Sequence, residues 1–198
     1  MTASATTTTP TGSQTWSVWQ IDTAHSLVEF SIRLMVVSTV KGRFTGLTGT
    51  IIDGSDSRAY SSVKAQVDAT SLITGDPKRD EHLRSADFFD VANYPSITFE
   101  SRRVVGPRDK FIVIGDLTIH GQTREVTLEV NFNGVGINPH GETIAGFTAE
   151  TTIKRKDFGL DFNVALEAGG IFVSDNLKVS ITLEAIRGDA EATATAQC

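Results

Sequence analysis

The side chains that could do chemistry are densest in one short segment, residues 79–91. In this segment His82 could act with Asp80, Asp87 or Asp90, because a carboxylate beside a histidine is a common pair in general acid–base catalysis. The segment also carries Arg79 and Arg84, which would pair with the acidic side chains of an ordinary solvated turn. We therefore interpret it as a charged surface turn and name no catalytic residue. The alternative is an enzyme that acts on a hydrophobic small molecule through His82 and Asp80.

Metal ligands and nucleophiles are scattered along the chain rather than grouped. No pair of histidines, and no histidine with Asp22 or Asp80, has the spacing of a zinc motif such as H-E-x-x-H. We predict no metal and no cofactor, and we expect the histidines to make backbone hydrogen bonds in separate turns. The sequence also lacks a G-x-S-x-G elbow, and its one cysteine is the last residue, Cys198. The histidines are His25, His82, His120 and His140.

The composition is that of a single acidic domain. The chain has 198 residues, of which 39% are hydrophobic and 21% charged, and its formal net charge is −6. This balance argues against nucleic acid as a partner, because phosphate binding requires a surplus of lysine and arginine. Residues 16–187 are predicted to form one β domain between two disordered tails, 1–15 and 188–198, which contain too few large apolar residues to fold.

The two ends of the chain lead to an expectation about location. Residues 1–15 have neither the basic region nor the apolar region of a secretion signal. No stretch approaches the length of about 18 apolar residues that a transmembrane helix needs. The single cysteine excludes a disulfide within the chain and fits a reducing compartment. We therefore expect a cytoplasmic protein without stable membrane insertion.

Alternation of apolar and polar residues predicts an all-β fold. In residues 26–34, Val28, Phe30, Ile32 and Leu34 form one apolar stripe, and a period of two indicates a half-buried strand. Similar segments follow one another along the chain, which predicts an antiparallel sheet of about eight to ten strands rolled into a barrel. The segments with this pattern are 16–22, 26–34, 41–53, 61–69, 96–105, 110–119, 123–132, 143–156 and 177–186.

One short helical insertion is expected in the middle of the chain. Pro77 suits the first position of a helix, and Asp76 before it is a capping candidate. Residues 85–90, which include Phe88 and Phe89, lack alternation and are predicted to form a loop folded against an apolar body. Residues 35–40 also break the alternation, and there we expect a single turn of helix.

Large aromatic residues lie on the faces of the predicted strands, beside smaller Ile, Val and Leu. A small barrel is filled by such side chains, whereas a wider or flattened barrel leaves an apolar tunnel for one elongated ligand. These residues alone leave both possibilities open, a filled barrel that serves as a protein-interaction module and a hollow one. The aromatic wall consists of Phe30, Phe44, Phe99, Phe132 and Phe147.

Several segments resemble the YceI-like family and occur in the family's order. The most specific are HLRSADFFDV followed by YPSITFES within residues 82–101, and LTIHGQT at residues 117–123. DTAHSLVEFSIRL at residues 22–34, KRKDFGLDF at residues 154–162 and VSDNLKVSITLEA at residues 173–185 extend the resemblance. Together it covers about residues 16–186.

The resemblance implies a lipocalin-like antiparallel β-barrel that binds and carries, or sequesters, a long-chain isoprenoid or quinone-like lipid in its pore. It also implies that polar residues at the mouth, Arg79, His82 and Arg84, meet the head group, and that two copies pair as a homodimer. At Leu34 members of the family often carry histidine, and the leucine favours an uncharged or wholly apolar ligand. The expected ligand-binding residues are Phe30, Ile32, Leu34, Phe44, Phe99, Phe132, Phe147, Arg79, His82, Arg84, Phe88 and Phe89.

Overall fold

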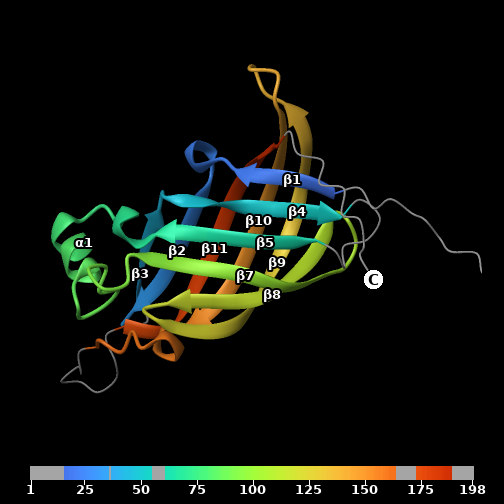
Figure 1. The fold of residues 1–198 in the computed structure, drawn as a ribbon. Coiled ribbons are helices and arrows are strands. Elements are labelled where there is room, and N and C mark those ends of the chain that lie inside the picture. The colour runs from blue at the N-terminus through green and yellow to red at the C-terminus, as the bar shows by residue number, and fades with distance from the viewer. Residues whose placement is uncertain (1–15, 36, 55–60, 164–172, 189–198) are drawn as a thin grey trace, which may run out of the picture.

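In the computed structural model, an 11-stranded antiparallel sheet accounts for most of the described residues (Figure 1). The structure describes residues 16–35, 37–54, 61–163 and 173–188. Cys198 and the two predicted tails, apart from Gly188, lie outside these ranges. The strands are β1 (Trp16–Ile21), β2 (Leu27–Leu34), β3 (Ser38–Phe44), β4 (Leu47–Gly54), β5 (Ser62–Asp68), β6 (Leu72–Ile73), β7 (Ser96–Val105), β8 (Lys110–Ile119), β9 (Gln122–Ile137), β10 (Thr143–Lys154) and β11 (Val173–Arg187).

Eight of these strands close into a barrel. The neighbours run in the order β1-β4-β5-β7-β8-β9-β10-β11, and β11 pairs back with β1. The closing seam is short, and it joins residues 19–21 of β1 to residues 185–187 of β11. Closure pairs the two outermost of these eight strands with each other, so neither is left as a free edge along the seam. The predicted antiparallel barrel is therefore confirmed.

The other three strands, β2, β3 and β6, extend the sheet from the first half of β11. Short 3₁₀ helices, η1 (Thr23–His25) and η3 (Ala69–Ser71), separate β1 from β2 and β5 from β6. Asp22 and Asp68 cap them by accepting hydrogen bonds from backbone N–H groups at 2.9 and 2.8 Å. Ser71 Oγ accepts from the N–H groups of Thr45 and Gly46, both at 3.1 Å, where β3 gives way to β4. These contacts place the break between β3 and β4 beside the break between β5 and β6, so β3 and β6 lie together outside the barrel.

Several predicted boundaries need correction. Where a helical turn was expected in residues 35–40, Val37 N–H donates to Leu34 O at 3.2 Å in a tight turn, and β3 begins at Ser38. The segment 41–53, predicted as one strand, is divided between β3 and β4. β9 continues to Ile137 instead of ending at Phe132, and it pairs with β10 over its whole second half.

The predicted short helix is present as α1 (Pro77–Arg84), followed by a loop that reaches Pro95. Asp76 caps it by accepting from the N–H groups of Lys78 and Arg79 at 3.0 and 3.2 Å. In Figure 1 the helix lies beside one end of the barrel. A further 3₁₀ helix, η4 (Arg155–Phe158), follows β10 at that end.

Packed aromatic rings fill the end of the barrel next to α1. The ring of Phe44 lies 5.7 Å from that of Phe30 and 5.6 Å from that of Phe89, measured between centroids. Leu72 and Phe158, with 0% and 1% of their surface exposed, pack into the same cluster. We call this the closed end, because these large buried side chains pack against one another there.

Candidate binding cavity

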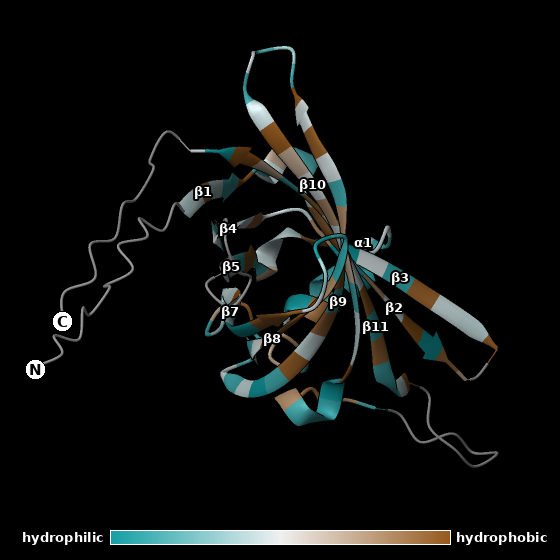
Figure 2. Cartoon of the chain, turned by 90° about the vertical axis from the view of Figure 1, so that its right-hand side faces the viewer, coloured by the Kyte–Doolittle hydropathy of each residue, from teal (hydrophilic) through white to brown (hydrophobic). Residues whose placement is uncertain are grey.

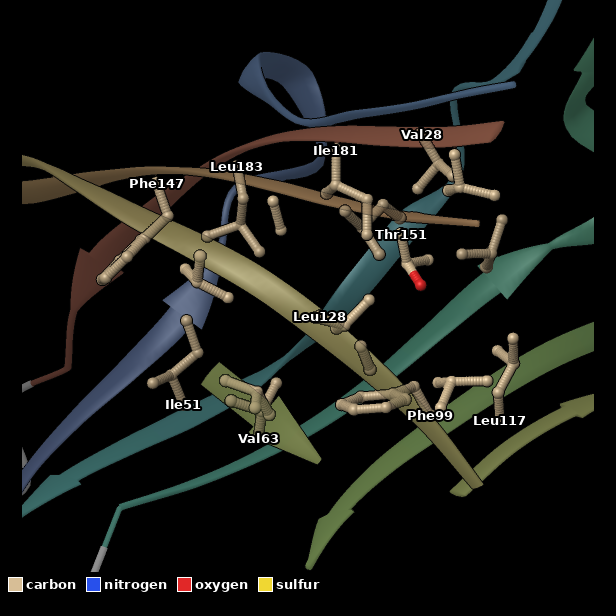
Figure 3. A pocket seen from close by; sticks show the side chains of 18 of the residues that line it. Val28, Ile51, Val63, Phe99, Leu117, Leu128, Phe147, Thr151, Ile181 and Leu183 are labelled. Atoms are coloured by element: carbon tan, nitrogen blue, oxygen red, sulfur yellow. The ribbon is translucent and has the colours of Figure 1, made fainter. Parts of the chain in front are cut away.

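The barrel encloses an apolar cavity of ≈ 230 Å³ between the closed end and the opposite rim. Figure 3 shows Ile51, Phe99, Leu128 and Leu183 pointing into it from different strands, with the hydroxyl oxygen of Thr151 as a polar atom among them. A filled barrel therefore does not describe this protein. Among the described residues, the polar members of the lining are Asp53, Ser61, Thr98, Arg108 and Thr151.

The apolar lining follows from the strand period. On β9, Val126, Leu128 and Val130 line the cavity, whereas Thr127 and Glu129 between them do not. Successive side chains of a strand point to opposite faces, so each strand gives the interior every second residue. The closed barrel gathers these alternate residues from its whole circumference around one interior.

The cavity is long and narrow. Along β8 its lining runs from Phe111 to Ile119, which corresponds to about 26 Å of strand at roughly 3.3 Å per residue. A volume of ≈ 230 Å³ lies below the range of about 300–1,000 Å³ found for pockets that hold drug-sized ligands. The lining is therefore long for the volume that it encloses.

One end of this space meets solvent. Val135, which lines the cavity, has 57% of its surface exposed, and Arg108 is also an exposed lining residue. Asp53 and Ser61 lie at the same rim, and Ser61 Oγ donates to Asp53 Oδ1 at 3.2 Å. We call this rim the open end. Three of the five polar lining residues, Asp53, Ser61 and Arg108, lie there, at the end opposite the packed aromatic rings.

Six of the residues singled out from the sequence as a ligand wall line the cavity, namely Phe30, Phe44, Phe89, Phe99, Phe132 and Phe147. Phe132 and Phe147 face each other across β9 and β10, with ring centroids 5.4 Å apart. Phe30 and Phe44 lie toward the closed end and belong to its packed cluster. Three other expected apolar contacts, Ile32, Leu34 and Phe88, are absent from the described lining.

The position of Ile32 and Leu34 follows from where β2 runs. Only the part of β2 that includes Val28 and Phe30 borders the cavity, and its later residues continue beyond the barrel. Leu34 pairs with Ser38 on one side and Val173 on the other, at the far end of the strand. The expected effect of Leu34 on ligand choice therefore lacks a structural basis.

The two arginines expected at a mouth are used to hold α1 against the sheet. Arg79 Nε donates to Thr74 Oγ1 at 2.7 Å, and its Nη2 donates to Thr74 O at 3.1 Å. Arg84 donates through Nε to Thr70 O at 3.1 Å and through Nη2 to Leu72 O. Both side chains lie at the closed end. They donate to backbone carbonyls of the segment around β6 and so help to satisfy its polar groups.

His82 lies on the outer surface, away from the cavity lining. Its Nε2 lies 3.2 Å from Asp87 Oδ2, and its ring packs edge-on against Phe88 and Phe162 at 5.2 and 4.9 Å. Asp80 is buried and accepts hydrogen bonds from Thr74, from its N–H at 2.8 Å and its hydroxyl at 2.5 Å. Of the carboxylates considered with His82 for acid–base catalysis, Asp87 contacts it at the surface, whereas Asp80 binds Thr74 beside α1.

Aliphatic lining residues were the part of the site that the sequence interpretation missed. It selected large aromatics, yet most of the lining is Val, Ile, Leu and Ala. The signal was available, since these residues hold the alternate positions of strands already predicted. In β1 the buried positions are Trp19 and Ile21. Among the additional lining residues are Ile51, Val63, Ala65, Val104, Val113, Leu117, Ala149, Ile181 and Leu183.

One group of potential metal ligands occurs among the described residues, at the break between β1 and β2. Ligand atoms of Asp22, His25 and Glu184 lie within 4.8 Å of one another. Asp22 Oδ2 lies 2.7 Å from His25 Nδ1 and accepts a hydrogen bond from the protonated ring, which raises the pKa of His25, and the charges of Asp22 and Glu184 add to this. The same bond lowers the pKa of Asp22. The three side chains have an ion-pair role that requires no metal.

Arg155 is the most deeply buried charged residue described, with 3% of its surface exposed. Its guanidinium donates to the carbonyls of Leu160, Phe162 and Ser174 at 2.5, 2.7 and 3.0 Å. Burial lowers the pKa of Arg155, and the nearby carboxylate of Asp175 opposes that shift. This side chain joins the segments that follow η4 and begin β11, beside the closed end.

None of the described helices is both long and apolar enough to span a membrane. The YceI-like domain model matches residues 19–185. The UPF0312 protein SA2479 of Staphylococcus aureus (strain N315) is 39% identical over 166 residues, which cover 82% of this chain and 94% of that protein.

Solved structures share the architecture. BcnA of Burkholderia cenocepacia has a TM-score of 0.72 and 24% identity, covering 83% of this chain and 98% of its own. A polyisoprenoid binding domain from Saccharophagus degradans, implicated in plant cell wall breakdown, has a TM-score of 0.62 and 19% identity, covering 87% and 98%. At these identities the two structures support the fold. Since the family model spans almost the whole barrel, and the staphylococcal relative matches over most of both chains, this chain belongs to the YceI-like family.

Proposed function

We propose that this protein binds a long-chain isoprenoid or a quinone-like lipid in its barrel and carries or sequesters it. The observation that supports this most directly is the long, narrow cavity with its almost wholly apolar lining. The similarity to a structure described as a polyisoprenoid binding domain points to the same class of ligand. A protein of this kind works by binding alone, and no catalytic residue is assigned.

The physical basis is the burial of hydrocarbon. An isoprenoid chain needs no hydrogen bonds along its length, so an apolar wall can accommodate it. Each Å² of apolar surface removed from water contributes roughly 25 cal/mol, from which the cost of immobilising the chain is subtracted. A polar head group would lie at the open end, where Asp53, Ser61 and Arg108 supply the polar lining. This replaces the head-group role first expected of Arg79, His82 and Arg84.

Mass spectrometry of the purified protein tests the proposal. Native spectra, followed by organic extraction, should reveal a bound hydrocarbon-rich lipid or the uptake of an added polyprenol. Protein that stays empty with every long-chain ligand offered would refute the proposal.

A cavity-filling variant locates the site. Ala149 is a small lining residue on β10, and Ala149→Phe should reduce lipid uptake at least tenfold by occupying the bore. Thr148→Phe adds a ring at the neighbouring residue, outside the lining, and should leave uptake unchanged. Both variants should first show cooperative thermal unfolding. Equal uptake by both variants would place the lipid outside the barrel.

Two expectations from the sequence belong to the same proposal, a cytoplasmic location and pairing into a homodimer. A barrel that encloses the hydrocarbon tail of a water-insoluble lipid would let that lipid travel through an aqueous compartment. Cell fractionation and light scattering test these two expectations independently of ligand binding.

A further inference from the structure

The apolar wall of the cavity continues past the rim of the barrel along the β9–β10 hairpin. On β9 the exposed fraction rises from 6% at Val130 to 57% at Val135 and 76% at Ile137. Val130 and Val135 line the cavity, and Ile137 lies on the same face as Val135 because it follows by two residues. Figures 1 and 2 show the hairpin extending beyond the rest of the barrel, with hydrophobic segments on its strands.

A register shift keeps this wall continuous. Phe132 pairs with Phe147, and Gly134 pairs with Gly146, so Asn133 is an extra residue in β9. Such a bulge changes the side to which later residues point. It is the reason why Phe132 and Val135, three positions apart, both line the cavity.

The hairpin is also poor in charge. Residues 130–149 contain a single formally charged side chain, Glu142, in a chain of which 21% is charged. The carboxylate of Glu142 accepts a hydrogen bond from Asn138 Nδ2 at 2.8 Å, and its N–H donates to Asn138 Oδ1 at 3.0 Å. The outer part of the hairpin, residues 133–146, which we call the tip, can therefore approach an apolar phase at a low desolvation cost, because moving charges out of water is the expensive step.

We propose that this hairpin tip is the contact site for the neutral surface of a phospholipid bilayer. Val135 and Ile137 enter the interfacial layer, and the open end then faces the lipid phase. This inference rests on the proposed function, since it supplies an apolar path by which a lipid passes between bilayer and bore. A net charge of −6 opposes anionic membranes, so the partner is a zwitterionic bilayer. Two exposed aliphatic side chains give a weak and reversible contact.

Vesicle flotation with phosphatidylcholine liposomes tests the contact. The intact protein should float with the vesicles, and Ile137→Asn should lower its partition coefficient about tenfold, since one large aliphatic side chain no longer leaves water. The matched control is Val37→Asn. Val37 is 84% exposed, against 76% for Ile137, and it lies in the turn between β2 and β3, near the start of β11 and so far from the hairpin. This control should float like the parent protein. Vesicles with added phosphatidylglycerol should bind no better than phosphatidylcholine alone.

A site-specific label gives a second, independent measurement. In a Cys198→Ser background, an environment-sensitive fluorophore at Ile137→Cys should shift its emission to the blue when vesicles are added. The same fluorophore at Val37→Cys should not. Equal flotation of Ile137→Asn and the parent protein, binding only to anionic vesicles, or no blue shift at Ile137→Cys would each overturn the proposal.

The outcome is separable from that of the lipid-binding proposal. Ile137 is outside the described lining, so Ile137→Asn should bind an added polyprenol in solution as well as the parent protein does. Ala149→Phe should show the converse, with normal flotation and little lipid. A protein that floats in an Ile137-dependent way but never takes up lipid would retain the membrane contact and lose the carrier function.

Discussion

Asp22 and His25 show how titratable residues are used in this molecule. They lie at the break between β1 and β2, where Asp22 both caps η1 and contacts the histidine at 2.7 Å. His25 also lies 3.7 Å from Glu184 of the facing strand β11. Although these three residue types could form a reaction centre, here they hold the bend at η1 against β11.

This cluster predicts a pH-dependent stability. The pKa of His25 is raised above its ordinary 6.5, so its contribution is complete below that pH and is lost as the pH rises through the raised value. The pKa of Asp22 is lowered below 3.8, so its contribution is present above that pH and is lost as the pH falls through the lowered value. The difference in Tm between the parent protein and His25→Ala should therefore be largest between about pH 4 and 6.5.

Thermal melts from pH 4 to 9 measure this difference. Asp22→Asn is the informative background, because asparagine keeps the cap of η1 and removes the charge. In that background most of the pH-dependent part of the His25→Ala effect should disappear. A His25→Ala difference that stays constant across the pH range would contradict the assignment.

At the scale of the element, glycine on β8 leaves room for the backbone of β7 and for the end of the Phe99 ring. A methyl group at Gly115 of β8 would lie 2.4 Å from Glu100 O and 2.7 Å from both Ser101 Cα and Phe99 Cζ. The backbone of β7 is irregular at this place, where the register shifts between Ser101 and Arg103. Because two of the three atoms belong to the backbone, the clash cannot be relieved by a change of rotamer.

Gly115→Ala should therefore destabilise the protein by about 1–3 kcal/mol, the usual range for overpacking. In an unobstructed strand the same replacement is favourable by roughly 0.5–1 kcal/mol. Gly146→Ala on β10 supplies this comparison, because the nearest atom to its added methyl is Asn133 Cβ at 3.5 Å. Urea denaturation of both variants measures the difference. Similar midpoints would show that β7 and β8 adjust to the methyl group.

Alternation made the strands predictable, but it carries no information about where a sheet ends. β7 and β8 have the predicted bounds, although a register shift between Ser101 and Arg103 interrupts the alternation of β7. Arg79 and Arg84 were expected at a mouth, whereas they donate to carbonyls around β6, the last strand of the sheet. Which carbonyls lack a neighbouring strand depends on pairing between distant segments, which no local pattern encodes.

The cavity was predictable in part for the same reason. The wall phenylalanines were found from their size and strand position, and the aliphatic residues beside them followed the same alternation. Ile32 and Leu34 share a stripe with Phe30 but lie where β2 has left the barrel. The assignment of any of these residues to a ligand remains a prediction until lipid binding is measured.

At the scale of the whole molecule, the question is how a ligand enters. The seam between β1 and β11 is only three residue pairs long, which makes it an obvious candidate for transient opening. However, Trp19 and Ala185 behind it are 9% and 0% exposed and pack together with Ala145. Opening the seam would expose this cluster to water, whereas the open end already brings the exposed Val135 to the cavity. We therefore expect entry through the end of the barrel.

A disulfide across the seam tests this route. Gln20 and Ile186 are directly paired, and such neighbours in an antiparallel sheet have Cα separations of about 4.5–5.5 Å, within the range a disulfide spans. In a Cys198→Ser background, the oxidised Gln20→Cys/Ile186→Cys protein should take up a fluorescent polyprenol analogue within twofold of the rate of its reduced form. Stopped-flow fluorescence compares the two forms of the same variant, so the substitutions themselves cancel. A tenfold slower uptake after oxidation would instead identify the seam as the entrance and make the exposed hairpin irrelevant to entry.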